Sequence, residues 1–256
     1  MERAKSVLTL DVGNTRVGMG CVMERQSSLG RRVSADEMGG LGDALVEVWD
    51  QMPSPKTVAA CSVCPPVLEA VENAVLTRLN REVLLVGREL PLPIDTDLPH
   101  PEKIGTDRLC AAAMAYFRLE TACVVADFGT AITIDCVSDQ GVFLGGAILP
   151  GLSMGAASLS AGTAQLPRVE LTAPDWVFGR DTREAIVGGL VYGARGALRE
   201  LTEAYAIALG RWPVVIATGG DAELVCQGYD IVQAIVPDLC LMGVALAVQM
   251  AEVQSP

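Results

Sequence analysis

The chain has 256 residues, half of them apolar, which is enough material for one large domain or two small ones with a buried core. Its formal net charge is −12, and such a negative field repels the phosphate backbones of DNA and RNA. Only 4 % of the residues are aromatic, which also argues against a surface that stacks on nucleic-acid bases.

The first half of the chain reads as alternating strands and helices. An apolar run at 7–10 predicts a strand that ends at Asp11, and residues 16–23 predict a second strand after a glycine-containing turn. The elements predicted next are a helix at 41–49, a strand at 57–63, a helix at 67–79, a strand at 83–86, an extended segment with four prolines at 90–101, and a helix at 107–119.

A second cycle of the same kind begins at Cys123. A short apolar run ends at Asp127, and after the sequence F-G-T-A a strand resumes at 132–137. The remaining predicted elements are a strand at 142–149, helices at 151–160, 183–209 and 237–249, and a strand at 213–217 that leads into T-G-G at 218–220.

The two cycles resemble each other. L-D-V-G-N-T at 10–15 matches A-D-F-G-T-A at 126–131, and both follow an apolar strand and lead into another. Similarity at about half the chain length indicates two related halves and not a solenoid. We therefore predict an α/β protein of two ribonuclease H-like halves, 1–119 and 120–256, each a mixed sheet with flanking helices.

The two D-x-G turns have the composition of phosphate-binding hairpins. Gly13 and Gly129 allow close approach of an anion and a positive φ, and successive N–H groups can form an anion-binding concavity. Asp11 and Asp127 make sense as ligands of Mg²⁺ or another cation beside the phosphates. One such turn alone is more often structural, but two in matching contexts favour function. Hydroxyl donors come from Thr15, Thr130 and Thr133.

Two shorter motifs accompany the hairpins. Gly219 and Gly220 follow a strand and can let a nucleoside approach the backbone closely. Asp107 and Arg108 stand at the start of the helix predicted after the proline-rich segment. Arg108 suits a carboxylate, and Asp107 could accept a proton from a substrate hydroxyl, although an aspartate here can also be a simple helix cap.

Other common sites have little support. The P-loop pattern GxxxxGK[ST] does not occur, and no GxGxxG follows the first strand. Cys61 and Cys64 form a CxxC without a second pair, and His100 is the only histidine, so we expect these cysteines to be structural. No signal peptide is evident, and the apolar run at 239–248 is too short to cross a bilayer, so we expect a cytoplasmic protein.

The whole set of motifs is more specific than any single one. Two phosphate hairpins, one in each half, resemble the actin-like kinase superfamily, and the ordered set resembles type III pantothenate kinase almost from end to end. The matching segments are D-V-G-N-T at 11–15, G-T-D-R at 105–108, D-F-G-T-A-I-T at 127–133, G-G-A-I-L-P-G at 145–151, G-R-D-T at 179–182 and T-G-G-D at 218–221.

This resemblance implies an enzyme that phosphorylates pantothenate with ATP in coenzyme A synthesis, and it implies roles for individual residues. Asp107 would be the general base, Asp127 would bind K⁺ (or NH₄⁺), and Thr130 would contact ATP. Thr182 would reach pantothenate near a partner subunit, because the family works as a homodimer. The pantothenate pocket would be lined by Gly105, Thr106, Asp107 and Arg108. ATP phosphates with Mg²⁺ would be held by Asp11, Val12, Gly13, Asn14, Thr15, Arg16, Val17 and Gly18.

Two positions depart from the family pattern. Leu98 stands where relatives often carry a tyrosine that touches pantothenate, and Asp181 replaces the usual asparagine of G-x-N-T. Two other functions remain open: an accessory transcriptional regulator of the same fold, and a kinase for another small hydroxy acid or sugar. The intact hairpins and Asp107 favour catalysis, and Arg108 favours an acidic substrate over a neutral sugar.

Overall fold

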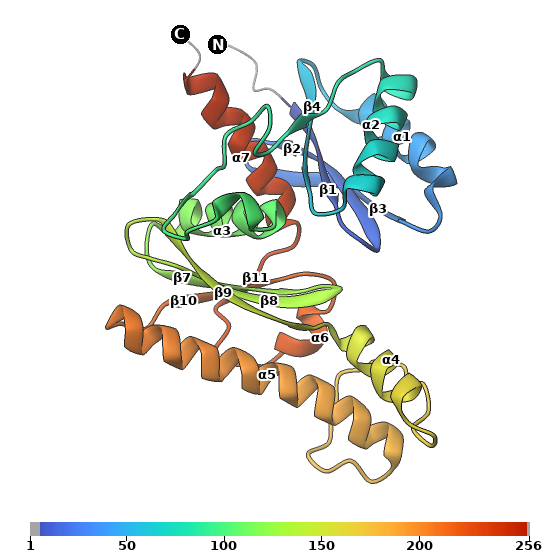
Figure 1. Ribbon diagram of the computed structural model, residues 1–256, viewed down its shortest axis with the longest axis vertical. Coiled ribbons are helices and arrows are strands. Elements are labelled where there is room, and N and C mark those ends of the chain that lie inside the picture. The colour runs from blue at the N-terminus through green and yellow to red at the C-terminus, as the bar shows by residue number, and fades with distance from the viewer. Residues whose placement is uncertain (1–5, 255–256) are drawn as a thin grey trace. The chain divides into compact units, whose positions relative to one another are not determined.

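The fold contains two mixed sheets, one in each of two units (Figure 1). The computed structural model describes residues 6–254. The first unit takes in the chain up to Arg118 and again from Asp238 onward, and the second unit is Leu119–Pro237. Each unit has its own hydrophobic core, so each is described by itself.

The first unit has its strands in the order β3-β2-β1-β4-β5, with β1, β2 and β3 antiparallel and β4 and β5 parallel to β1. Its core places Leu8 and Leu10 of β1 against Leu45 of α1 and Val71 of α2. The elements are β1 (Ser6–Val12), β2 (Arg16–Met23), β3 (Gln26–Ser34), α1 (Leu41–Gln51), β4 (Lys56–Ser62), α2 (Pro65–Leu79), β5 (Leu84–Leu85), β6 (Asp95–Thr96), α3 (Thr106–Leu119) and α7 (Leu239–Gln254), with 3-10 turns at Met38–Gly40 and Pro101–Lys103.

The second unit repeats this strand order as β9-β8-β7-β10-β11. Its first three strands are again antiparallel and its last two are parallel to β7. Phe128 of β7 and Leu198 of α5 are fully buried in its core. The elements are β7 (Cys123–Phe128), β8 (Ala131–Val137), β9 (Val142–Pro150), α4 (Leu152–Gly162), α5 (Thr182–Leu209), β10 (Val214–Thr218), α6 (Ala222–Cys226) and β11 (Ala234–Ile235).

The repeated topology confirms the predicted fold class. The division of the chain differs from the predicted halves at one end, because residues from Asp238 onward belong with the first unit and not with 120–237. The reason is α7, an apolar helix that packs on β1, β2 and β4 of the first sheet. Its apolar faces are buried at Leu239, Val244 and Ala247.

Some elements were not predicted. β3 carries mainly polar residues and is largely exposed at the sheet edge, so its sequence Q-S-S-L-G-R-R-V-S lacks the apolar alternation that signals a strand. The two-residue strands β6 and β11 and the five-residue helix α6 are too short to produce a periodic pattern. Across residues 6–254, no helix combines the length and the apolar character needed to span a membrane.

Candidate active site

The first hairpin turn joins β1 and β2 in the first unit. Val12 pairs with Val17, and the Gly13 N–H donates to the carbonyl oxygen of Arg16 at 3.0 Å, which closes the turn. Asn14 and Thr15 lie exposed at its tip, while the Asp11 side chain is half-buried where β1 ends. The turn therefore presents backbone N–H groups and a carboxylate together, as an anion site with a bridging cation requires.

The second hairpin turn repeats this arrangement between β7 and β8. Phe128 pairs with Ile132, the Gly129 N–H donates to the Ala131 carbonyl oxygen at 3.1 Å, and Asp127 is half-buried at the strand end. Thr130 is exposed at the tip. The second turn is one residue shorter than the first.

The prediction of a positive φ at the hairpin glycines is wrong. Among the described residues, the glycines with positive φ do not include Gly13 or Gly129. Gly13 is required for space instead, because a Cβ there would lie 3.2 Å from the Arg16 carbonyl oxygen. Near the second hairpin, a positive φ is found instead at Gly219, with a value of +96°.

Gly219 brings the T-G-G turn against the second hairpin within the second unit. A Cβ on Gly219 would lie 2.4 Å from Asp127 Oδ1 and 2.5 Å from the Phe128 carbonyl oxygen. The Asp221 N–H donates to that same carbonyl oxygen at 2.9 Å. Because Gly219 has no side chain, its backbone can lie next to Asp127 Oδ1 and the Phe128 carbonyl oxygen, and oxygen atoms of these two types are ligands that suit a hard cation such as K⁺ or Mg²⁺.

Gly151 supports the second hairpin from the end of β9. Its N–H donates to the Thr130 carbonyl oxygen at 3.2 Å, and a Cβ there would lie within 2.4 Å of the Gly129 and Thr130 carbonyl oxygens. The motif G-G-A-I-L-P-G thus packs its last glycine directly on the turn that carries Thr130.

Asp107 lies in the first turn of α3 and is half-buried. Its Oδ1 accepts a hydrogen bond from the Arg108 N–H at 2.8 Å, and the Arg108 N–H also contacts the Gly105 carbonyl oxygen. A Cβ on Gly105 would lie 2.4 Å from Asp107 Oδ1, so glycine is needed to leave room for this carboxylate. Gly105, Asp107 and Arg108 thus form one local structure at the start of the helix.

Thr106 anchors the start of α3 to the first sheet. Its Oγ1 accepts from the Ser62 N–H at 3.1 Å and donates to the Ser62 carbonyl oxygen at 3.2 Å. Ser62 is the last residue of β4 and pairs with Val12 of β1. These hydrogen bonds fix the start of α3 at the same sheet end as the first hairpin, and so bring Asp107 and Asp11 to one side of the first unit.

Thr182 is the first residue of α5 and is exposed. Two hydrogen bonds hold the helix start that carries Thr182. The Asp181 side chain accepts from the Glu184 N–H at 2.8 Å, and Glu184 Oε2 accepts from the Arg180 N–H at 2.7 Å. This reciprocal pair is a capping arrangement, for which aspartate is as suitable as asparagine. At the other departure from the family pattern, the Leu98 N–H donates to Thr96 Oγ1 at 3.2 Å.

Sequence reasoning missed the surroundings of Asp11. Cys61 Sγ lies 3.6 Å from Asp11 Oδ1 and 3.3 Å from Cys240 Sγ. Hydrogen bonds from the thiols of Cys110 and Cys240 lower the pKa of Cys61, and the same hydrogen bonds together with burial raise the pKa of Cys110 and Cys240. No sequence signal links Cys61 to Cys240, which stand far apart along the chain, whereas the CxxC drew attention to Cys64.

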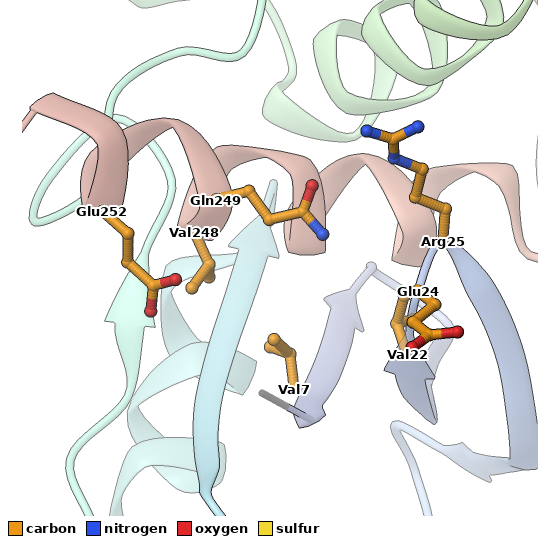
Figure 2. Close-up of a pocket in the computed structure, with 7 residues that line it drawn as sticks. All are labelled: Val7, Val22, Glu24, Arg25, Val248, Gln249 and Glu252. Atoms are coloured by element: carbon orange, nitrogen blue, oxygen red, sulfur yellow. The ribbon is translucent and has the colours of Figure 1, made fainter. Parts of the chain in front are cut away.

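A cavity of about 380 Å³ lies elsewhere in the first unit (Figure 2). It opens at the start of β1, near Val7, and not at the strand end that carries Asp11. Arg25 and Glu24 lie at the turn between β2 and β3, and α7 closes another side. None of the predicted site residues lines this cavity. Its lining residues are Val7, Val22, Glu24, Arg25, Val248, Gln249 and Glu252.

Comparison with known proteins gives a consistent result. The type III pantothenate kinase family model matches residues 7–204. A type III pantothenate kinase of Dehalococcoides mccartyi is 32 % identical over 257 residues, covering 97 % of each chain. Another, from Akkermansia muciniphila, is 38 % identical over 187 residues, covering 73 % of this chain and 76 % of the relative.

Solved structures extend the comparison to the fold. A Campylobacter jejuni chain named as a candidate Baf-family transcriptional activator superposes with a TM-score of 0.59 at 20 % identity, covering 96 % of this chain and 99 % of that one. At that identity the likeness shows the fold alone. The (R)-2-hydroxyglutaryl-CoA dehydratase component A of Acidaminococcus fermentans superposes with a TM-score of 0.55 at 15 % identity, covering 97 % of this chain and 100 % of that one, and again this shows the fold alone. The family model and these relatives together confirm the predicted relationship: the chain belongs to the type III pantothenate kinase family.

Proposed function

We propose that this protein phosphorylates pantothenate with ATP, the first step of coenzyme A synthesis, and that Asp107 is the general base. The observation that carries the proposal is family membership over nearly the whole chain, with Asp107 held at the start of α3. Phosphoryl transfer needs mainly positioning and neutralisation of charge, and the site supplies these through hairpin N–H groups and carboxylates.

Each residue has a definite task in this mechanism. Asp107 accepts the proton of the primary hydroxyl as the hydroxyl oxygen attacks the γ-phosphorus of ATP, and ADP leaves. Arg108 pairs with the carboxylate of pantothenate. Asp11 holds Mg²⁺ beside the phosphates at residues 11–18, and Mg²⁺ supplies neutralisation of the phosphate charge.

In the second unit, Asp127 holds K⁺ and Thr130 contacts ATP. The closeness of Asp127 Oδ1 and the Phe128 carbonyl oxygen beside Gly219 supports the cation site. Gly219 and Gly220 offer backbone to the nucleoside. Thr182 contacts pantothenate in a homodimer; its exposure at the start of α5 is compatible with a position near a partner subunit. The cytoplasmic location stays a prediction.

The first experiment measures ADP formation from ATP with and without pantothenate, in K⁺ and then in Na⁺ buffer. We expect turnover that requires pantothenate and is faster in K⁺. Retained nucleotide binding without pantothenate-dependent turnover would contradict the assigned substrate.

The second experiment replaces Asp107 with asparagine. General-base catalysis contributes about 10²–10⁴-fold, so we expect Asp107→Asn to lower kcat by about 10²-fold or more without loss of the fold. The matched control is Glu102→Gln, which removes an exposed carboxylate five residues earlier and should leave kcat unchanged. A folded Asp107→Asn protein with near-normal kcat would remove Asp107 from the role of base.

A further inference from the structure

Three side chains that are far apart in the sequence meet at the end of β1. Asp11 of β1 and Cys61 of β4 are paired residues of adjacent parallel strands, so their side chains leave the same face of the sheet. Cys240 comes from α7, which packs on these strands. The ligand atoms of these three residues all lie within 4.8 Å of one another.

The distances in this cluster resemble those between ligands of one tetrahedral metal ion. Zinc lies about 2.3 Å from a cysteine sulfur and about 2.0–2.2 Å from a carboxylate oxygen, which separates a sulfur and an oxygen ligand by about 3.5 Å and two sulfur ligands by about 3.8 Å. Cys61 Sγ lies 3.6 Å from Asp11 Oδ1 and 3.3 Å from Cys240 Sγ. A small outward movement of Cys240 would therefore admit the metal.

The type of ligand decides which cation fits. Two thiolates favour a thiophilic ion, whereas Mg²⁺ and K⁺ prefer oxygen atoms alone. Cys61 is fully buried and Cys240 is 8 % exposed, but Asp11 is only half-buried and gives a route of entry. Cys110, whose thiol hydrogen-bonds to Cys61, can orient the Cys61 sulfur from outside this group of three ligands.

We propose that Asp11, Cys61 and Cys240 form a binding site for a thiophilic divalent cation of the Zn²⁺ class, and that its occupation inhibits the kinase. Inhibition by the bound cation rests on the proposed function, because it follows from the role of Asp11 as a ligand of Mg²⁺ beside ATP. Zinc bound to Asp11 withdraws that carboxylate from the phosphate hairpin and replaces a labile, oxygen-bound ion with a thiolate-bound one.

The binding test uses Co²⁺, which replaces Zn²⁺ and gives a sulfur-to-cobalt charge-transfer absorption band. The full-length protein is titrated without oxygen, in a phosphine reductant that keeps the cysteines reduced. We expect one Co²⁺ per chain with a thiolate band that Zn²⁺ abolishes. Cys61→Ala and Cys240→Ala should each weaken the band and lower Co²⁺ affinity by at least about tenfold.

A matched control separates ligand loss from general damage. Cys21→Ala removes another buried cysteine of the first unit that lies on β2, outside the cluster, and should leave the cobalt band unchanged. Thermal unfolding of every variant checks that it folds. No thiolate band in the wild type, or an unchanged band in Cys61→Ala and Cys240→Ala, would overturn the site.

The inhibition test measures pantothenate-dependent turnover during the same titration with Zn²⁺, at constant excess Mg²⁺. The wild-type rate should fall in step with occupancy of the site, while Cys240→Ala should keep its own zinc-free rate at the same zinc concentrations. A wild-type rate that stays constant as the site fills would overturn inhibition. A cobalt band in a chain without kinase activity would support the metal site and contradict the proposed function instead.

Discussion

Thr106 and Ser62 exchange two hydrogen bonds across the first unit: Thr106 Oγ1 accepts from the Ser62 N–H and donates to the Ser62 carbonyl oxygen, at 3.1 and 3.2 Å. One hydroxyl group thus connects the last residue of β4 to the first residue of α3. Asp107 follows directly, so the position of the proposed base depends on this contact.

Thr106→Val should therefore affect both stability and catalysis. Valine has nearly the same shape but leaves two half-buried backbone groups of Ser62 without this partner, which should cost about 1–3 kcal/mol of unfolding free energy. We expect kcat to fall more than KM rises, because Asp107 loses its anchor. Urea unfolding and steady-state kinetics measure the two effects. Thr106→Ser keeps the hydroxyl and should recover most of both; failure of that rescue would contradict the anchoring role.

Gly219→Ala should damage the second hairpin site. The added Cβ would lie 2.4 Å from Asp127 Oδ1, and alanine is strained at φ of +96°. We expect loss of K⁺ stimulation and a higher KM for ATP. The control is Gly210→Ala, where φ is +70° but nothing lies within 4 Å of the new Cβ. That variant carries the backbone strain without the clash, so it should lose stability alone; equal kinetic damage in both variants would contradict the Asp127 contact.

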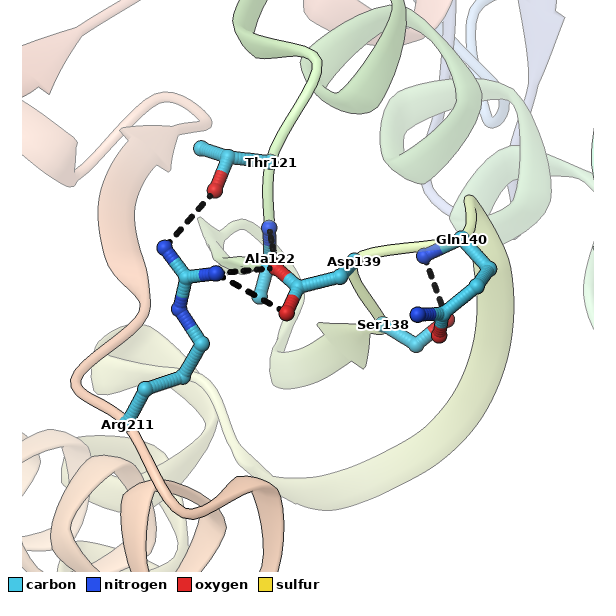
Figure 3. Close-up of polar contacts among 6 residues, drawn as sticks. All are labelled: Thr121, Ala122, Ser138, Asp139, Gln140 and Arg211. Atoms are coloured by element: carbon cyan, nitrogen blue, oxygen red, sulfur yellow. Dashed lines mark hydrogen bonds and ion pairs between the residues drawn. The ribbon is translucent and has the colours of Figure 1, made fainter.

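The interactions of the Asp139 carboxylate should make the stability of the second unit depend on pH (Figure 3). Its Oδ1 accepts from the Ala122 N–H at 3.0 Å, and both its oxygens lie 2.9 Å from one nitrogen of Arg211. The Ala122 N–H, and then Arg211, lower the pKa of the Asp139 carboxyl. A carboxyl whose pKa is lower in the folded chain stabilises it above the unfolded pKa of about 3.9 and loses that effect as pH falls through the folded pKa.

The measurement compares the Tm of the wild type and of Asp139→Asn from neutral pH down to strongly acidic pH. The wild type should have the higher Tm at neutral pH, and the difference should shrink as pH falls below about 4. A difference that is independent of pH would show that the charge of Asp139 contributes nothing.

Gly243→Ala should separate two helices of the first unit. A Cβ on Gly243 of α7 would lie 2.0 Å from the Cys110 carbonyl oxygen of α3, so the helices must move apart, at a cost of about 1–3 kcal/mol. Gly189→Ala in α5 is the control, because nothing lies within 4 Å of its new Cβ. Alanine there should raise stability by up to about 1 kcal/mol. Chemical denaturation of both variants tests the difference in sign.

Much of the architecture could be predicted because its signals are local. Apolar runs that end at Asp11 and Asp127 mark the two hairpins, and the similarity of the two segments predicts the repeated topology. The start of α3 at Thr106 is also visible in sequence, since a glycine and an acidic residue follow a proline-rich segment.

What could not be predicted depends on contacts between distant segments. The apolar pattern of α7 predicts a helix but not the sheet on which it packs. The contact between Cys61 and Cys240 could not be predicted either, because the strand β4 and the helix α7 meet only in the folded unit. The need for a glycine at position 219 likewise arises from its packing against Asp127, which no local pattern reports.

The return of α7 to the first unit has a consequence for synthesis on the ribosome. The first sheet lacks the helix that covers β1, β2 and β4 until residues after Asp238 have emerged, and the whole of Leu119–Pro237 is made in between. At translation rates of about 5–20 residues per second, that interval lasts on the order of ten seconds. During this interval the surface of β1, β2 and β4 on which α7 packs lacks that helix, so the first unit becomes complete only after α7 has been made.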